Sequence, residues 1–282
     1  MTRLATLLLT AALLATLPGC SQPDANAAAT QASSPRTQLP AYGRFVAVYL
    51  APQTGALRSL YKQAKQERWL DEVVHSLNAQ FRLPRDIDVA TAECGVSNAF
   101  FDPEAHSITL CYELIVELQE QALAQKLPAA EQEAYLQGVL SFVFMHELGH
   151  ALVHELALPA TGREEDVADQ LAVVSLLGEP DSDSEQVFAN SVAQIGHVAT
   201  WFQLNASGEY EMEALADSHA LNEQRFYNVM CWLYGAQPDA FDDMIVSGQL
   251  PAERAEGCAD EYRRIRHSWD TLLAPHMLTQ TH

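Results

Sequence analysis

Two histidines and a glutamate in the segment Phe144–Leu152 have the types and spacing to bind and use a metal ion. His146, Glu147 and His150 form a His-Glu-x-x-His pattern, and residues four apart share one helix face, so both imidazoles can reach one ion. Glu147 need not bind the ion, because a carboxylate beside a zinc-activated water can accept its proton and deliver it to a leaving amine. The pattern predicts one Zn²⁺ ion held by His146 and His150, with Glu147 as the general base of peptide-bond hydrolysis.

The surroundings of this motif strengthen the prediction. It lies in an apolar stretch, Val139–Leu152, where buried polar side chains are costly without partners. Gly149 costs about 1 kcal/mol in a helix, which indicates close packing beneath the metal. His154 continues the four-residue series, but it lies one turn too far along for the same ion. We expect His154 to be an exposed histidine, and His106 has no partner pattern.

A third ligand is expected downstream, because catalytic zinc sites have three protein ligands and one open position. Glu165 and Asp169 stand four residues apart at the start of a predicted helix. We assign Glu165 to the metal and Asp169 to the ring N–H of a ligand histidine. Asp169 and Glu164 remain alternative ligands, and the helix dipole alone explains acids at a helix N-terminus, Glu164 and Asp166 included.

His219 and Tyr227 are candidates to stabilise the oxyanion of a tetrahedral intermediate, since each can donate a hydrogen bond from a predicted helix. They lie eight residues apart, roughly on one helix face. The alternative for His219 is a structural pairing with Asp217 or Glu223. Of the two candidates we assign His219 the catalytic role.

The motif followed by Glu165-x-x-x-Asp169 resembles the gluzincin pattern of zinc peptidases, with an unusually short gap between the two helices. The wider chain, over most of 42–260, is similar to a bacterial family of metallopeptidase-type proteins of unknown function. The segments that carry this resemblance are Pro103–Leu114, His146–Ala172 and Asp217–Asn228. It implies a zincin fold and the zinc roles above. By analogy with that fold, Ser107–Tyr112 would be the strand along which a peptide lies.

The elements that must position these residues form a small sheet and a helical body. Strands are expected over 45–50, 87–94 and 107–112, the last two as a hairpin-like pair around a turn-like stretch at 98–106. The expected helices are 57–81, 113–126, 131–156, 164–177, 184–205, 212–235, 239–247 and 252–272. The prediction is an α+β, zincin-like fold in which a small N-terminal sheet packs on a mainly α-helical body containing the His-Glu-x-x-His helix.

The N-terminus and the cysteines indicate an exported protein. Residues 1–19 read as a signal peptide ending before Cys20 in a lipoprotein-like box, so we expect Cys20 to carry lipid, with residues 20–40 as a flexible tether and 41–282 as the domain. Ser21 fits outer-membrane sorting, which places the chain in the bacterial cell envelope facing the periplasm. The other cysteines suit two disulfides, by sequence separation Cys94 with Cys111 and Cys231 with Cys258, and free buried thiols are the alternative.

Composition limits the possible functions. Hydrophobic residues make up 48% of the 282 residues, enough to bury a core, and the net charge of -21 with 16 Lys and Arg disfavours nucleic acid and anionic lipid surfaces. We therefore expect a zinc metallopeptidase acting on a peptide or protein, touching the membrane through its lipid only. A zinc-stabilised binding or assembly lipoprotein without catalysis is the alternative. A protein partner, a peptidoglycan peptide and an exported peptide all remain open as substrates.

Overall fold

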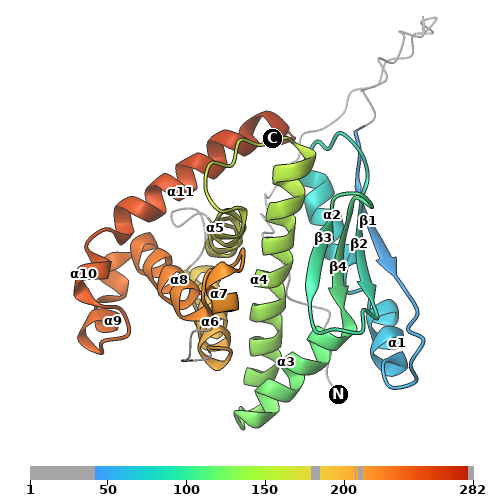
Figure 1. Cartoon of the computed structure of the whole chain (residues 1–282), viewed down its shortest axis with the longest axis horizontal. Coiled ribbons are helices and arrows are strands. Elements are labelled where there is room, and N and C mark those ends of the chain that lie inside the picture. The colour runs from blue at the N-terminus through green and yellow to red at the C-terminus, as the bar shows by residue number, and fades with distance from the viewer. Residues whose placement is uncertain (1–41, 179–184, 207, 209–211, 279–282) are drawn as a thin grey trace, which may run out of the picture.

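The protein combines a small β-sheet with a mainly helical body, which confirms the expected α+β class (Figure 1). The computed structural model describes residues 42–178, 185–206, 208 and 212–278. The expected signal peptide, Cys20 and tether lie outside the described residues. The strands are β1 (Phe45–Tyr49), β2 (Ile87–Ala92), β3 (Ala99–Asp102) and β4 (Ser107–Cys111). The helices are α1 (Arg58–Glu67), α2 (Asp71–Gln80), α3 (Tyr112–Ala124), α4 (Ala129–Glu155), α5 (Glu164–Leu177), α6 (Glu185–Leu204), α7 (Met212–Ala216), α8 (Asn222–Ala236), α9 (Asp242–Val246), α10 (Ala252–Ala255) and α11 (Cys258–Leu273), with 3₁₀ turns at Pro238–Ala240 and Ala274–His276.

Helix α4 runs between the sheet and the other helices of the body (Figure 1). It contacts β3 and β4 on one side and α5 and α6 on another, while α1 and α2 pack against β1. Among the described residues, α4 is the helix long and apolar enough to cross a membrane, yet 78% of its most apolar window is buried inside the fold. We therefore interpret its apolar character as that of a core helix.

The sheet has the strand order β1-β2-β4-β3, in which β1, β2 and β4 are parallel and β3 is antiparallel to β4. The expected hairpin between 87–94 and 107–112 is therefore wrong, because these two strands are parallel neighbours. The true hairpin joins β4 to β3, which lies inside the stretch 98–106 that we expected to be a turn. The turn signal Asp102-Pro103 dominates this stretch, and the strand before it is only 4 residues long.

Both expected disulfides are present. Cys94 is bonded to Cys111, which ties the segment after β2 to the last residue of β4, and Cys231 is bonded to Cys258, which ties α8 to α11. The first disulfide closes a loop that contains β3 and β4, so the ends of this hairpin segment are covalently fixed.

The expected helix 57–81 is two helices, α1 and α2, separated at Arg68. Arg68 has a left-handed backbone with φ of 56°, and the N–H of Trp69 bonds to the carbonyl of Ala64, the geometry of a helix C-terminus. The apolar repeat already contains the break, because Ala64 is followed by Leu70 at six residues rather than three or four.

The expected helix 212–235 is also interrupted, by a turn at residues 217–221 between α7 and α8. The carboxylate of Asp217 accepts a hydrogen bond from the N–H of His219 at 2.8 Å, a local contact that competes with helix formation. The predicted segment 239–247 is shortened to α9 behind a 3₁₀ turn, and 252–272 divides into α10 and α11.

Candidate active site

Helices α4 and α5 approach each other closely beside the two histidines of the motif. A Cβ atom added to Gly149 would lie 2.9 Å from Cα of Ala168, closer than real Cβ contacts. Glycine is therefore required here to let the backbones approach. This close packing carries Glu165, one turn before Ala168, to the histidine face of α4.

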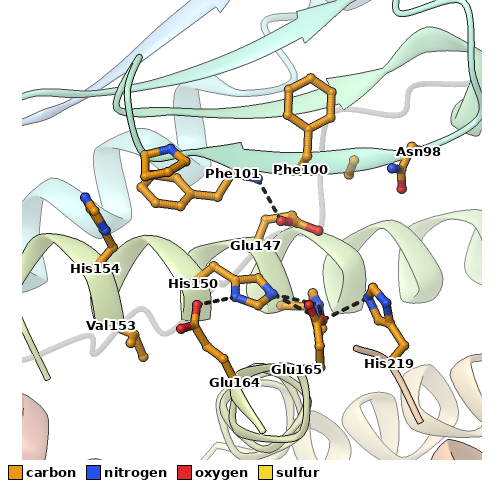
Figure 2. A pocket seen from close by; sticks show the side chains of 13 residues that line it. Asn98, Phe100, Phe101, Glu147, His150, Val153, His154, Glu164, Glu165 and His219 are labelled. Carbon is orange, nitrogen blue, oxygen red and sulfur yellow. Dashed lines mark hydrogen bonds and ion pairs between the residues drawn. The ribbon is translucent and has the colours of Figure 1, made fainter. Parts of the chain in front are cut away.

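Three donor atoms between α4 and α5 form a nearly equilateral triangle, and Figure 2 shows two of the side chains, His150 and Glu165. Glu165 Oε2 lies 3.1 Å from His146 Nε2 and 3.3 Å from His150 Nε2, and the two Nε2 atoms are 3.2 Å apart. Tetrahedral ligands at zinc distances of about 2.0–2.1 Å are about 3.3 Å from one another, so the triangle matches one face of such a tetrahedron. Two imidazoles and a carboxylate at this spacing fit a divalent metal ion.

The outer nitrogens of both motif histidines are held by carboxylates. His146 Nδ1 donates to Asp169 Oδ1 at 2.8 Å and His150 Nδ1 to Glu164 Oε1 at 2.7 Å, since an ionised carboxylate only accepts. The structure thus places Asp169 in the orienting position assigned from the sequence, and Glu164 takes the same position for His150 rather than serving only as a helix-capping acid. Such contacts fix the tautomer that leaves Nε2 free for a metal.

Arg225 supports this arrangement from α8, and the sequence analysis gave it no role. Its guanidinium donates to both oxygens of buried Asp169, at 2.8 and 2.7 Å, and stacks over the ring of Phe202. Burial opposes ionisation of Asp169, but the charge of Arg225 and the bond from His146 hold its pKa below the usual value. A single arginine 56 residues away forms no sequence pattern with the motif.

The pKa values of the three histidines around Glu165 are all raised, which favours positive charge at this site. Burial lowers the pKa of His146, but its bonds with Asp169 and Glu165 outweigh burial and raise the pKa to about 9. The pKa of Glu165 is strongly lowered by the histidines around it, against the opposing effect of burial. The site is therefore built to hold positive charge beside Glu165.

Glu147 points away from the donor triangle toward the sheet (Figure 2). Its Oε2 accepts a hydrogen bond from the N–H of Phe101 in β3 at 2.9 Å. Burial raises the pKa of Glu147, while the nearby His146 and His150 act in the opposite direction. Phe101 acts through its backbone, which every residue possesses, so no sequence signal could have identified it.

His219 lies on the turn between α7 and α8 and directs Nε2 at Glu165 (Figure 2). The oxygen it faces, Oε2, is the one that His146 and His150 also face. Nε2 is 2.8 Å from Glu165 Oε2, and Nδ1 is 3.1 Å from Asp217 Oδ1. The bond with Glu165 is the main cause of its raised pKa. The structure therefore brings His219 to the site and also forms the alternative contact with Asp217.

Tyr227 is not brought to the site, which contradicts the sequence-based suggestion. It is exposed on α8, with its ring against Phe226, and it does not line the pocket formed by the described residues. The expectation that His219 and Tyr227 share a helix face fails because the turn at 217–221 separates them. Glu223, the other suggested partner of His219, accepts from the N–H of Gly208.

A pocket of about 710 Å³ lies between α4 and β3 and exposes the triangle and Glu147. Its sheet side is formed by 98–101 and Pro103, and its α4 side extends to Val153 and His154. His154 is exposed as expected, yet it lines the pocket and contacts the ring of Phe101. The strand beside the pocket is β3, which forms the edge of the sheet. The expectation that a peptide lies along Ser107–Tyr112 is wrong, because this strand lies inside the sheet, between β2 and β3.

A second cluster at the C-terminal end of α4 also contains histidine and carboxylate. Glu155, with its side chain 1% exposed, bonds His106 Nδ1 at 2.6 Å and Arg85 Nε at 3.2 Å. Arg85 also donates to His106 Nε2 at 3.0 Å, which closes a ring of three contacts. The donor atoms of His106, His154 and Glu155 all lie within 4.8 Å of one another.

An α+β fold with a His-Glu-x-x-His helix and a converging carboxylate defines a metallopeptidase-like protein. Residues 49–273 match the model of a family whose description reads "Putative metallopeptidase", and the chain belongs to this family. The match confirms the family resemblance suggested by the sequence. Searches of curated proteins and of solved structures found no match.

Proposed function

We propose that the protein is a zinc-dependent peptidase in which His146, His150 and Glu165 hold the ion. A bound zinc ion would lower the pKa of a water molecule and polarise the carbonyl of the scissile bond. The observation that carries the proposal is the placement of Glu147, whose carboxylate is fixed by the strand across the pocket rather than joined to the donor triangle. A purely structural metal site has no need for such a carboxylate.

Glu147 is suited to act as the general base. The Phe101 N–H binds one carboxylate oxygen, which leaves the other for proton transfer. Its raised pKa brings the carboxylate closer to working pH, where a general base is most efficient. It would take a proton from water and deliver it to the amine that leaves.

His219 would donate a hydrogen bond to the oxyanion of the tetrahedral intermediate. Asp217 orients its ring through Nδ1, and Nε2 faces the donor triangle. Its side chain is 45% exposed, so a substrate in the pocket can reach it. Donors aimed at developing charge lower the barrier most when they are held in place beforehand.

The outer edge of β3, which faces away from β4, would hold the peptide substrate. The N–H of Phe101 points away from β4, since it donates to Glu147, and the backbone of Ala99 has the same orientation because alternate residues share a side. An extended peptide can add to such an edge through main-chain hydrogen bonds, which would bring its carbonyl groups over α4.

The first test compares the protein with Glu147→Gln and, as a matched control, Glu133→Gln, which changes an exposed glutamate of the same helix. Zinc content and cleavage of a mixed peptide library are measured for all three. We expect equal zinc, equal cleavage by parent and control, and cleavage reduced about 10²- to 10⁴-fold in Glu147→Gln. Zinc without cleavage in every protein would support the non-catalytic lipoprotein instead, and absence of zinc would exclude both functions.

We also propose that the protein is anchored in the bacterial cell envelope by lipid on Cys20, facing the periplasm from the outer membrane. The support is the apolar leader that ends in Leu17-Pro18-Gly19-Cys20, followed by Ser21. The full chain should fractionate with membranes and a Cys20→Ala chain should not. Equal distribution of both chains would contradict the anchor.

A further inference from the structure

Three histidines at the pocket follow one plan, although only two belong to the motif. Each directs Nε2 at the same oxygen, Glu165 Oε2, at 3.1, 3.3 and 2.8 Å for His146, His150 and His219. Each also has Nδ1 against a carboxylate of its own. These pairs are His146 with Asp169, His150 with Glu164 and His219 with Asp217, at 2.8, 2.7 and 3.1 Å.

This plan is characteristic of histidines that bind metal. A ligating histidine almost always donates its other ring N–H to a carboxylate, carbonyl or water, which orients the ring. Asp217 provides this contact for His219 through its side chain and also accepts from the N–H of His219, at 2.8 Å. A histidine that only filled space on an exposed turn would not need an orienting carboxylate.

His219 differs from the other donors in how firmly it is held. The side chains of His146, His150 and Glu165 are 6%, 14% and 18% exposed, whereas that of His219 is 45% exposed. The first three lie on α4 and α5, but His219 lies on the 217–221 turn. Of these four residues, only His146, His150 and Glu165 have donor atoms that all lie within 4.8 Å of one another, so His219 would join them through a movement of the turn.

We propose that His219 is a fourth protein ligand of the metal in the resting protein and leaves it when a substrate enters. This inference rests on the proposed metal site and adds regulation to it. Four protein ligands close a zinc site, whereas catalysis needs an open position. His219 is the donor that can leave at the lowest cost, and once displaced it lies beside the reacting carbonyl as a hydrogen-bond donor.

The test counts the imidazole ligands of the bound metal. The purified protein and the variants His219→Ala and Asp217→Asn are loaded with zinc for X-ray absorption spectroscopy and with cobalt for visible spectra. His154→Ala serves as control, because it removes another exposed histidine of the pocket. We expect three imidazoles in the parent and control and two in His219→Ala, with metal affinity lowered about 10- to 100-fold in Asp217→Asn, which disturbs only the orienting contact.

A small metal-binding probe tests whether the site is closed. Acetohydroxamate should change the cobalt spectrum of His219→Ala at a lower concentration than that of the parent, because no protein ligand must leave first. Two imidazoles in both proteins, or equal acetohydroxamate titrations, would overturn the inference and leave the three-ligand peptidase intact. Failure of every protein to bind metal would overturn the inference together with the proposed function.

Discussion

Helix α4 contributes to two clusters of histidine and carboxylate, and the contacts of the histidine rings differ between them. In the C-terminal half of the helix, carboxylates hold the Nδ1 atoms of His146 and His150, and the two Nε2 atoms are 3.2 Å apart. At the end of the helix, Glu155 holds Nδ1 of His106, but Arg85 occupies Nε2. The ring of His106 therefore has no lone pair left for a metal.

The difference shows that the group facing the second ring nitrogen decides what such a cluster does. Arg85 donates both to the carboxylate of Glu155 and to the second ring nitrogen of His106, so it supplies the positive charge itself and ties the segments before β2 and β4 to α4. Where no arginine reaches Nε2 of the histidine, the positive charge must come from protons or a metal ion. Residue types alone do not separate the two cases.

The largest contrast is expected from removing one histidine of each cluster. His150→Ala deletes a corner of the donor triangle and should abolish stoichiometric zinc binding, while His106→Ala should retain one ion per chain. Metal analysis after dialysis checks both. Loss of zinc in His106→Ala alone would reverse the assignment of the two clusters.

A large effect on stability, rather than on metal, is expected from Arg85→Met. It removes the arginine that pairs with the buried carboxylate of Glu155, and breaking a buried pair costs about 3–5 kcal/mol. The partial exposure of Arg85, 55%, favours the lower end of that range. Denaturant unfolding measures the loss, and zinc content should stay unchanged. A loss below about 0.5 kcal/mol would show that the ring of contacts contributes little.

A smaller effect is expected when the outer contact of the metal cluster is removed. Asp169→Asn takes from His146 the carboxylate that orients it, and should weaken zinc binding about 10- to 100-fold. Competition with a chelator of known affinity measures the change. Unchanged affinity would mean that packing alone orients the ring.

The most gradual effect concerns pH. The pKa of His146 is raised from 6.5 to about 9, so its contribution to the stability of the metal-free protein is complete below pH 6.5 and lost as pH rises through 9. Zinc binds only the neutral ring. The zinc-induced rise in Tm should therefore grow between pH 6.5 and 9, measured by thermal unfolding with and without zinc. A rise that shrinks over this interval would contradict the charge balance described for the site.

Local spacing accounts for what could be predicted of the site. His146 and His150, like Glu165 and Asp169, are four residues apart, and helical geometry converts that spacing into a shared face without knowledge of the fold. The contacts of Arg225 and Phe101 join segments 56 and 46 residues apart. They depend on how helices and strands pack, which no local pattern contains.

The same limit of local patterns explains which features of the fold could be predicted from the sequence. The sheet-plus-helices class and both cysteine pairings follow from patterning and sequence separation. The parallel pairing of β2 with β4 does not, because β3 is short and fills the outer position beside β4. The helix breaks at Arg68 and at 217–221 arise from single residues with local hydrogen bonds. Hydrophobic periodicity is judged over many residues and does not detect such local breaks.

The position of α4 between two different layers separates two tasks within one helix turn. His146 faces α5 and its neighbour Glu147 faces β3, so the layer that would hold the ion and the layer that would contact the peptide share no residues. Relatives could acquire new preferences through changes in the short edge strand while the ion-holding layer stays untouched. Such a division would allow the peptide preference to change while the proposed chemistry stays the same.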